Sequence, residues 1–249
     1  MKVFNLFLFL IPSIVFAEGY PWGRFHSMKR EKGKVYFLLK EGNGHLDKGV
    51  PVFYQIDPES WKVNSITQNE YETISAPPTT TILPWKKLLH PTEIVTADKT
   101  VFHPEYTHCK DMEEGDPICS ENYLIYQDKK IKLQESEGRT VLFAEKWNNQ
   151  VWLGYGYEGE YGWEGRGFQV YDLASGKKVF GYAEPIMGGI LPSLFMIDSQ
   201  RNWMWVGTSA GLLVFDKSFK LIHYCHLSVP DMHGGKYNFD CITQEKQKK

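Results

Sequence analysis

The stretch Trp205-Val206-Gly207-Thr208-Ser209-Ala210-Gly211-Leu212-Leu213-Val214-Phe215-Asp216 decides the fold class. Two short apolar runs are separated by the small residues Ser209 and Ala210, and the second run ends at Asp216. Short apolar runs with turn residues between them are typical of antiparallel β-strands. Extending this pattern in both directions predicts four consecutive strands, Leu194 to Ile197, Trp203 to Gly207, Gly211 to Phe215 and Lys220 to Tyr224.

The same pattern recurs along the chain at a spacing of 44 residues. Asp172 ends a similar strand 44 residues before Asp216, and a further step of 44 residues reaches Asp128. A more distant first copy ends at Asp57, 71 residues before Asp128. A period near 44 residues, made of four short strands, is typical of a β-propeller blade, because each blade buries both faces only when it is stacked between neighbours. An antiparallel sandwich, whose hairpins also recur at short intervals, is the alternative.

Over Trp205 to Asp216 the chain resembles the repeat of bacterial two-component-regulator-type β-propellers. That repeat consists of Trp-hydrophobic-Gly-Thr, then Gly-Leu, then a strand that ends in Asp. The preceding copy keeps Val151-Trp152-Leu153-Gly154 and Gly167-Phe168 with a loop between them, and the two earlier copies keep little beyond the strand and its Asp. The resemblance implies a propeller fold and a sensing or binding role. We therefore expect an all-β chain that forms a small β-propeller of four to five four-stranded blades.

The N-terminus has the features of a secretory signal peptide. Lys2 precedes an almost wholly apolar run from Val3 to Val15, and Val15-Phe16-Ala17 presents suitable residues to a signal peptidase. The apolar run is too short to cross a bilayer, which takes roughly 20 residues. We predict a signal peptide over 1–17, a propeller domain over 18–243, a polar tail over 244–249, and a periplasmic or secreted location with no membrane span after signal removal.

The composition favours an all-β fold, and the net charge disfavours a nucleic-acid-binding protein. The 15 Phe, 14 Tyr and 8 Trp, with 22 Gly and 13 Pro, suit many short strands joined by turns. The chain has 28 Lys and Arg against 30 Asp and Glu, a formal net charge of -2. A nucleic-acid-binding protein would show a basic surplus, so we predict no nucleic-acid partner.

The four cysteines predict two disulfides, because an exported chain folds in an oxidising compartment. Three pairings are possible, and we favour the local one, Cys109 with Cys119 and Cys225 with Cys241, since it pins two polar loops. With Cys241 tied to Cys225, the segment Tyr237 to Ile242 is available as an added strand. In propellers such a strand commonly completes a blade that is built from both ends of the chain.

The loops that join the second to the third strand of each copy are expected on one face of a propeller. They span 41–49, 103–117, 155–166 and the minimal Ser209-Ala210. Binding usually resides in loops held by a rigid scaffold, so this face is the candidate site.

The third of these loops alternates aromatic residues with Gly and Glu. Aromatic rings can stack on a sugar or enclose a cation, and carboxylates accept hydrogen bonds from hydroxyl or ammonium groups. The alternative is an extended β-ribbon whose aromatic side chains pack on the rim. The candidate ligand-binding residues are Tyr155, Tyr157, Glu158, Glu160, Tyr161, Trp163, Glu164 and Arg166.

Two clusters of potential metal ligands do not match known spacings. The acidic run from Asp111 to Asp116 lacks the pattern of a calcium-binding EF-hand loop. The set His223, Cys225, His226, His233 and Cys241 matches no structural zinc pattern, and a disulfide with surface histidines accounts for the same residues. We therefore predict no metal and no cofactor.

The predicted function is an exported, non-enzymatic binding module that engages an envelope protein, a peptide or a glycan through the long-loop face. The alternative is an exported propeller enzyme, a lyase or glycosidase, that uses paired carboxylates on the same face. An enzyme needs titratable groups from different blades in one pocket, and no such pair is evident in the sequence. A structural subunit of an envelope assembly is the third possibility.

Overall fold

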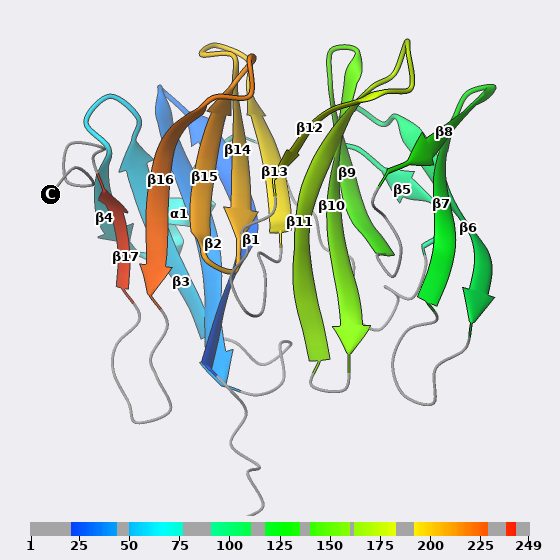
Figure 1. Cartoon of the computed structure of the whole chain (residues 1–249). Coiled ribbons are helices and arrows are strands. Elements are labelled where there is room, and N and C mark those ends of the chain that lie inside the picture. The colour runs from blue at the N-terminus through cyan, green and yellow to red at the C-terminus, as the bar shows by residue number, and fades with distance from the viewer. Residues whose placement is uncertain are drawn as a thin grey trace, which may run out of the picture.

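The computed structural model describes residues 21–43, 50–76, 91–110, 118–134, 140–159, 162–182, 192–228 and 238–242. In this part of the chain, 17 strands form four antiparallel sheets, and one short helix lies beside them (Figure 1). The all-β prediction is confirmed. No helix in these ranges is long and apolar enough to cross a membrane.

Each sheet is built from strands that follow one another in the chain. Sheet I contains β1 (Pro21–Glu31), β2 (Lys34–Asn43), β3 (Val50–Asp57) and β4 (Lys62–Ile66). Sheet II contains β5 (Ile94–Val95), β6 (Val101–Lys110), β7 (Ile118–Tyr126) and β8 (Lys129–Leu133). Sheet III contains β9 (Thr140–Trp147), β10 (Gln150–Gly159), β11 (Gly162–Asp172) and β12 (Lys178–Tyr182). Sheet IV contains β13 (Pro192–Asp198), β14 (Trp203–Thr208), β15 (Gly211–Asp216), β16 (Leu221–Ser228) and β17 (Asn238–Ile242). The four strands predicted for the last copy are β13 to β16.

Three clusters of buried hydrophobic residues join the sheets face to face. Phe37 of sheet I and Trp205 of sheet IV share the first cluster. Trp152 of sheet III packs with Phe215 of sheet IV in the second, and Phe102 of sheet II lies with sheet III in the third. The packing order is therefore I, IV, III, II, so the first and last sheets of the described chain contact each other.

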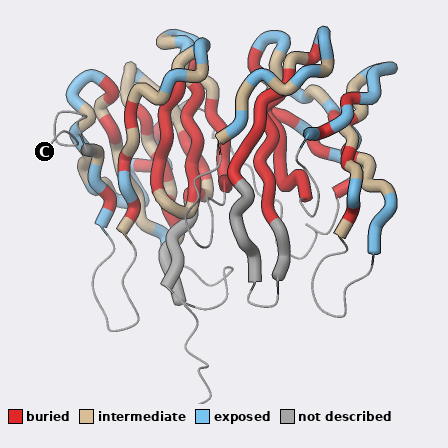
Figure 2. The backbone as a smooth tube through the Cα atoms, viewed as in Figure 1, coloured by how far each residue is buried: buried red, intermediate tan, exposed pale blue. Residues whose placement is uncertain are grey.

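Burial follows from the apolar pattern of the strands (Figure 2). Strands β9, β13, β14 and β15 are apolar at nearly every position and are buried on both faces, because sheets III and IV each lie between two others. Strand β8 instead alternates, with Ile131 and Leu133 buried and the lysines exposed. On that exposed face of sheet II, Lys130 pairs with Glu105 and Lys132 pairs with Glu121.

The recurring Asp residues mark the same turn in successive sheets. Asp57, Asp172 and Asp216 end the third strand of their sheets, and Asp128 lies in the two-residue turn that follows β7. Three carboxylates accept a backbone N–H within the turn, from Glu59 to Asp57 at 2.9 Å, from Ser175 to Asp172 at 2.7 Å and from Ser218 to Asp216 at 2.8 Å. Hydrogen bonds in these turns hold the pKa of the three carboxyls below its usual value.

The prediction of how the chain ends meet is only partly right. Strand β17 is indeed an added strand, but it pairs with β16 in its own sheet, and sheet I is built from N-terminal strands alone. No described sheet contains strands from both ends of the chain. The ends meet instead through packing, because Phe239 of β17 enters the cluster between sheets I and IV.

The sequence analysis did not predict the helix α1 (Gln68–Glu72). The Thr67 side chain accepts a hydrogen bond from the Glu70 backbone N–H, and the Glu70 carboxylate accepts one from the Thr67 backbone N–H, which completes a capping box. Tyr71 is buried, with its hydroxyl 2.6 Å from Ser27 Oγ and its ring 5.2 Å from that of Phe53. The helix thus covers the face of sheet I that is turned away from sheet IV.

Gly207 of the repeat leaves the space that a neighbouring sheet needs. A Cβ atom at this position would lie 2.7 Å from Phe25 Cβ and 2.8 Å from Phe25 Cγ. We expect Gly207→Ala to destabilise the protein by about 1 to 3 kcal/mol, because sheet I would have to move away from sheet IV. Urea unfolding measures this cost. Gly181→Ala, whose nearest foreign atom would be 3.8 Å away, is the matched control, and an equal loss in both variants would contradict the prediction.

Candidate functional site

The two sides of the molecule differ in how the strands are connected. The turns between first and second strands and between third and fourth strands lie on one side, and none spans more than five residues. Because the sheets are antiparallel, the second strand of each ends on the opposite side, which is the lower side in Figure 1. Strands β2, β6, β10 and β16 all end there. We call this the long-connection side, since the strands that precede 44–49, 111–117 and 229–237, which lie outside the described residues, end on it.

The predicted loop from Tyr155 to Arg166 is largely a β-ribbon. Strands β10 and β11 continue through it, and Tyr157 pairs with Glu164 while Glu158 pairs with Trp163. The backbone therefore follows the ribbon alternative. The expectation of a loop rested on the glycines in this segment, which are unfavourable in strands.

The candidate binding residues on this ribbon are only partly described. Tyr155 is fully buried in the cluster between sheets II and III, so its ring packs in the core. Glu160 and Tyr161 lie outside the described residues, as do the side chains of Tyr157, Glu158, Trp163, Glu164 and Arg166. A ligand-binding role for these residues stays a prediction.

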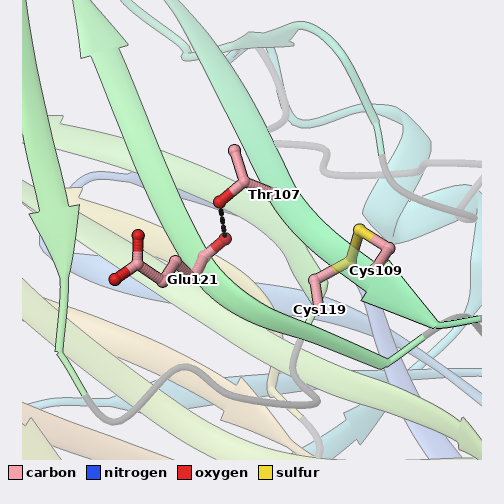
Figure 3. Close-up of a disulfide and its surroundings, with 4 residues drawn as sticks. All are labelled: Thr107, Cys109, Cys119 and Glu121. Carbon is pink, nitrogen blue, oxygen red and sulfur yellow. Dashed lines mark hydrogen bonds between the residues drawn. A yellow bond between two sulfur atoms is a disulfide. The ribbon is translucent and has the colours of Figure 1, made fainter.

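The disulfide between Cys109 and Cys119 closes the hairpin of β6 and β7 (Figure 3). The two cysteines face each other in the strand register, and Thr107 Oγ1 donates a hydrogen bond to the carbonyl of Glu121 at 3.2 Å. The predicted pairing is confirmed. The acidic run from Asp111 to Asp116 continues from this hairpin and lies outside the described residues.

The disulfide between Cys225 and Cys241 joins β16 to β17, which confirms the second predicted pairing. The idea that surface histidines surround it is wrong for His223, which is only 4% exposed. His226 is exposed, and its Nδ1 lies 3.0 Å from Ser228 Oγ. His233 lies outside the described residues.

His223 is enclosed by aromatic rings at the interface of sheets I and IV. Its imidazole stacks on Trp61, which belongs to the turn between β3 and β4, with centroids 3.7 Å apart and planes at 9°. Trp203 stacks on Trp61 with centroids 5.8 Å apart. Burial lowers the pKa of His223 to about 4, so the imidazole is neutral near pH 7. Its Nε2 atom has no hydrogen-bond partner among the described residues.

Glu145 is a second buried titratable group that the sequence analysis did not single out. It lies on β9, and its carboxylate accepts hydrogen bonds from the backbone N–H groups of Ala97 at 3.3 Å and Lys146 at 3.2 Å. Burial, with a contribution from the charge of Asp98, raises the pKa of Glu145 to about 7. The signal in the sequence was a Glu directly after the apolar run from Val141 to Ala144.

The shifted pKa values of Glu145 and His223 predict opposing effects of pH on stability. Because the folded state raises the pKa of Glu145 from 4.5 to about 7, stability increases as the pH falls through this range. Because the folded state lowers the pKa of His223 from 6.5 to about 4, stability is complete above pH 6.5 and decreases as the pH falls toward 4. The two effects partly cancel between pH 4.5 and 6.5 in the wild type.

Single variants should separate the two effects. We expect Glu145→Gln to be more stable than the wild type at pH 8, by about 2 to 3 kcal/mol, and to lose stability on acidification. His223→Phe keeps a flat ring on Trp61, and its stability should increase on acidification from pH 7 to 4.5. Urea midpoints at several pH values measure both slopes. Parallel curves for the three proteins would contradict the assignment of either group.

Glu145 and His223 cannot act together on one substrate. Glu145 contacts the turn between β5 and β6, whereas His223 lies between sheets I and IV. In the described residues these two buried groups therefore belong to different interfaces, and neither is placed as the partner of the other in acid–base chemistry.

Comparisons with known proteins assign no family to the chain: no model of a protein family matches it, and no curated protein is significantly similar to it.

Proposed function

We propose that this protein is an exported β-propeller that binds a glycan, a peptide or an envelope protein through its long-connection side, without catalysing a reaction. The observation that carries the proposal is the asymmetry of the scaffold. Two sheets that are buried on both faces hold the strand ends in place, and strands β2, β6, β10 and β16 all end on one side. Loops on such a scaffold are where binding usually resides.

A propeller is the finer description that the sheet arrangement favours. Four consecutive meanders, which pack in the order I, IV, III, II through three apolar clusters, correspond to four blades. The turn that contains Asp57, Asp128, Asp172 or Asp216 recurs once in each sheet. Contact between sheets I and IV brings the first blade against the last, as ring closure requires, and no cluster of the described residues joins sheet I to sheet II, so the ring is open between these two blades.

The two disulfides support an extracytoplasmic location, because such bonds persist in oxidising compartments. The periplasm or the cell exterior is therefore the proposed place of action. The predicted signal peptide over 1–17 is consistent with it and is tested by N-terminal sequencing of the exported protein.

A glycan array and a peptide array, probed with the purified protein, test the binding function. Trp163→Ala should weaken binding to any ligand found by at least tenfold, because a stacking ring is lost. Glu59→Gln, on the opposite side of the molecule, is the matched control and should bind normally. Loss of binding in both variants, or in neither, would place the site elsewhere.

The competing enzymatic function has its own test. A lyase or glycosidase would degrade a glycan during prolonged incubation, and Glu158→Gln or Glu164→Gln would abolish the turnover. Such a result would overturn the non-enzymatic proposal. Recovery of one stoichiometric protein partner in a pull-down, with empty arrays, would instead favour a structural subunit.

A further inference from the structure

The strand register brings three potential metal ligands together around the second disulfide. Cys225 and Cys241 face each other on β16 and β17, and His223 lies two residues before Cys225, on the same face of β16. One ligand atom from each of the three residues lies within 4.8 Å of the others. Ligand atoms around one zinc ion with Zn–S bonds of about 2.3 Å are separated by roughly 3.5 to 4 Å, so small side-chain rotations would suffice.

The surroundings of His223 favour a ligand at this place. Its side chain is 4% exposed, and the buried Nε2 atom has no hydrogen-bond partner among the described residues. A buried nitrogen without a partner costs free energy, which a bound ion would recover. The stacked Trp61 ring fixes the orientation of the imidazole.

We propose that, once the disulfide between Cys225 and Cys241 is reduced, these two cysteines and His223 bind one zinc ion. In the first step a dithiol reductant is oxidised to its disulfide, and Cys225 and Cys241 become two thiols. In the second step Zn²⁺ displaces the two thiol protons, which leave to solvent. Two thiolates and a neutral imidazole give a complex with no net charge, which suits a buried site.

Among the described residues the group has three members, so the fourth coordination position is left without a protein ligand. A water molecule can therefore complete a tetrahedral set. The ion would replace the disulfide as the link between β16 and β17, so Phe239 would stay between sheets I and IV.

Cobalt titration of the reduced protein tests the site. Cys109→Ser with Cys119→Ser removes the other disulfide, and a phosphine reductant opens the remaining one without competing for metal. We expect one Co²⁺ per chain, with a thiolate-to-cobalt absorption band that Zn²⁺ abolishes, and no band in the oxidised protein. A protein that also carries Cys225→Ser and Cys241→Ser should show no band.

His223→Phe tests the third ligand and should weaken Co²⁺ binding by at least tenfold. Equal affinity in this variant, or no thiolate band in the parent protein, would overturn the proposal. If the reduced His223→Phe protein does not fold, the test uses the reduced protein that carries only Cys109→Ser and Cys119→Ser. Its melting temperature should rise on addition of Zn²⁺, and an unchanged value would overturn the site.

Discussion

Removing the disulfide between Cys225 and Cys241 is expected to lower the melting temperature much more than removing the one between Cys109 and Cys119. The bridges close rings of similar size, with sequence separations of 16 and 10 residues. If each bridge acted only on the unfolded chain, their contributions would differ by about 0.4 kcal/mol. The folded structure adds a larger difference, because the two bridges hold different parts of the protein.

The Cys225–Cys241 bridge holds a strand that joins the two ends of the fold. Phe239 of β17 lies with its ring centroid 5.7 Å from Phe25, 5.0 Å from Phe37 and 5.6 Å from Tyr54, all in sheet I. Without the bridge, the pairing with β16 and the packing of Phe239 on sheet I are what hold β17 in the described part of the chain. The other bridge joins two strands that β8 and sheet III already support, and Cys109 is exposed.

Thermal unfolding of two double variants measures the difference. Cys225→Ala with Cys241→Ala should melt at least roughly 5 °C below Cys109→Ala with Cys119→Ala, given 2 to 4 °C per kcal/mol for a domain of this size. Phe239→Ala alone should cost about 3 to 5 kcal/mol. Removing the bridge in the Phe239→Ala background should then cost less than in the wild type. Equal melting temperatures of the two double variants would show that β17 does not depend on its disulfide.

The sheets and bridges were predictable because their signals are local. The stretch from Trp205 to Asp216 alternates apolar runs and turn residues over a few positions, and the structure has strands at those places. Both disulfides connect cysteines that lie close in the sequence and face each other across adjacent strands. The spacing between Asp172 and Asp216 could be read without knowledge of the tertiary structure.

The errors concern properties that depend on distant parts of the chain. His223 is buried because Trp61, more than a hundred residues earlier, covers it, and no local pattern predicts such a contact. Tyr155 was assigned to a loop because glycines follow it, although tertiary packing continues the strand and encloses the ring. The helix α1 was an avoidable omission, since the capping box from Thr67 to Glu70 is visible in the sequence.

Asp198 shows the same dependence on distant partners and leads to the second large effect that we expect. Asp198 is the last residue of β13, directly before the turn to β14. In the structure its side chain is fully buried, and it accepts hydrogen bonds from the backbone N–H groups of Gln200 at 3.1 Å and Arg201 at 3.2 Å. The guanidinium groups of Arg30, 2.7 Å away, and Arg201, 3.3 Å away, neutralise the carboxylate. Arg30 belongs to β1, so this ion pair ties sheet I to sheet IV.

Asp198→Asn should therefore destabilise the protein by about 3 to 5 kcal/mol, because it removes the buried counter-charge of Arg30 and leaves Arg201, among the described residues, with the exposed carboxylate of Glu59 alone. The shape of the side chain is retained, so the loss reports charge more than volume. Glu59→Gln is the matched control: Glu59 also pairs with Arg201, at 3.9 Å, but its side chain is 86% exposed. A surface ion pair of this kind contributes at most about 1 kcal/mol. Urea unfolding of both variants at pH 7 measures the two costs, and a loss in Asp198→Asn no larger than that in Glu59→Gln would show that sheets I and IV do not depend on the buried ion pair.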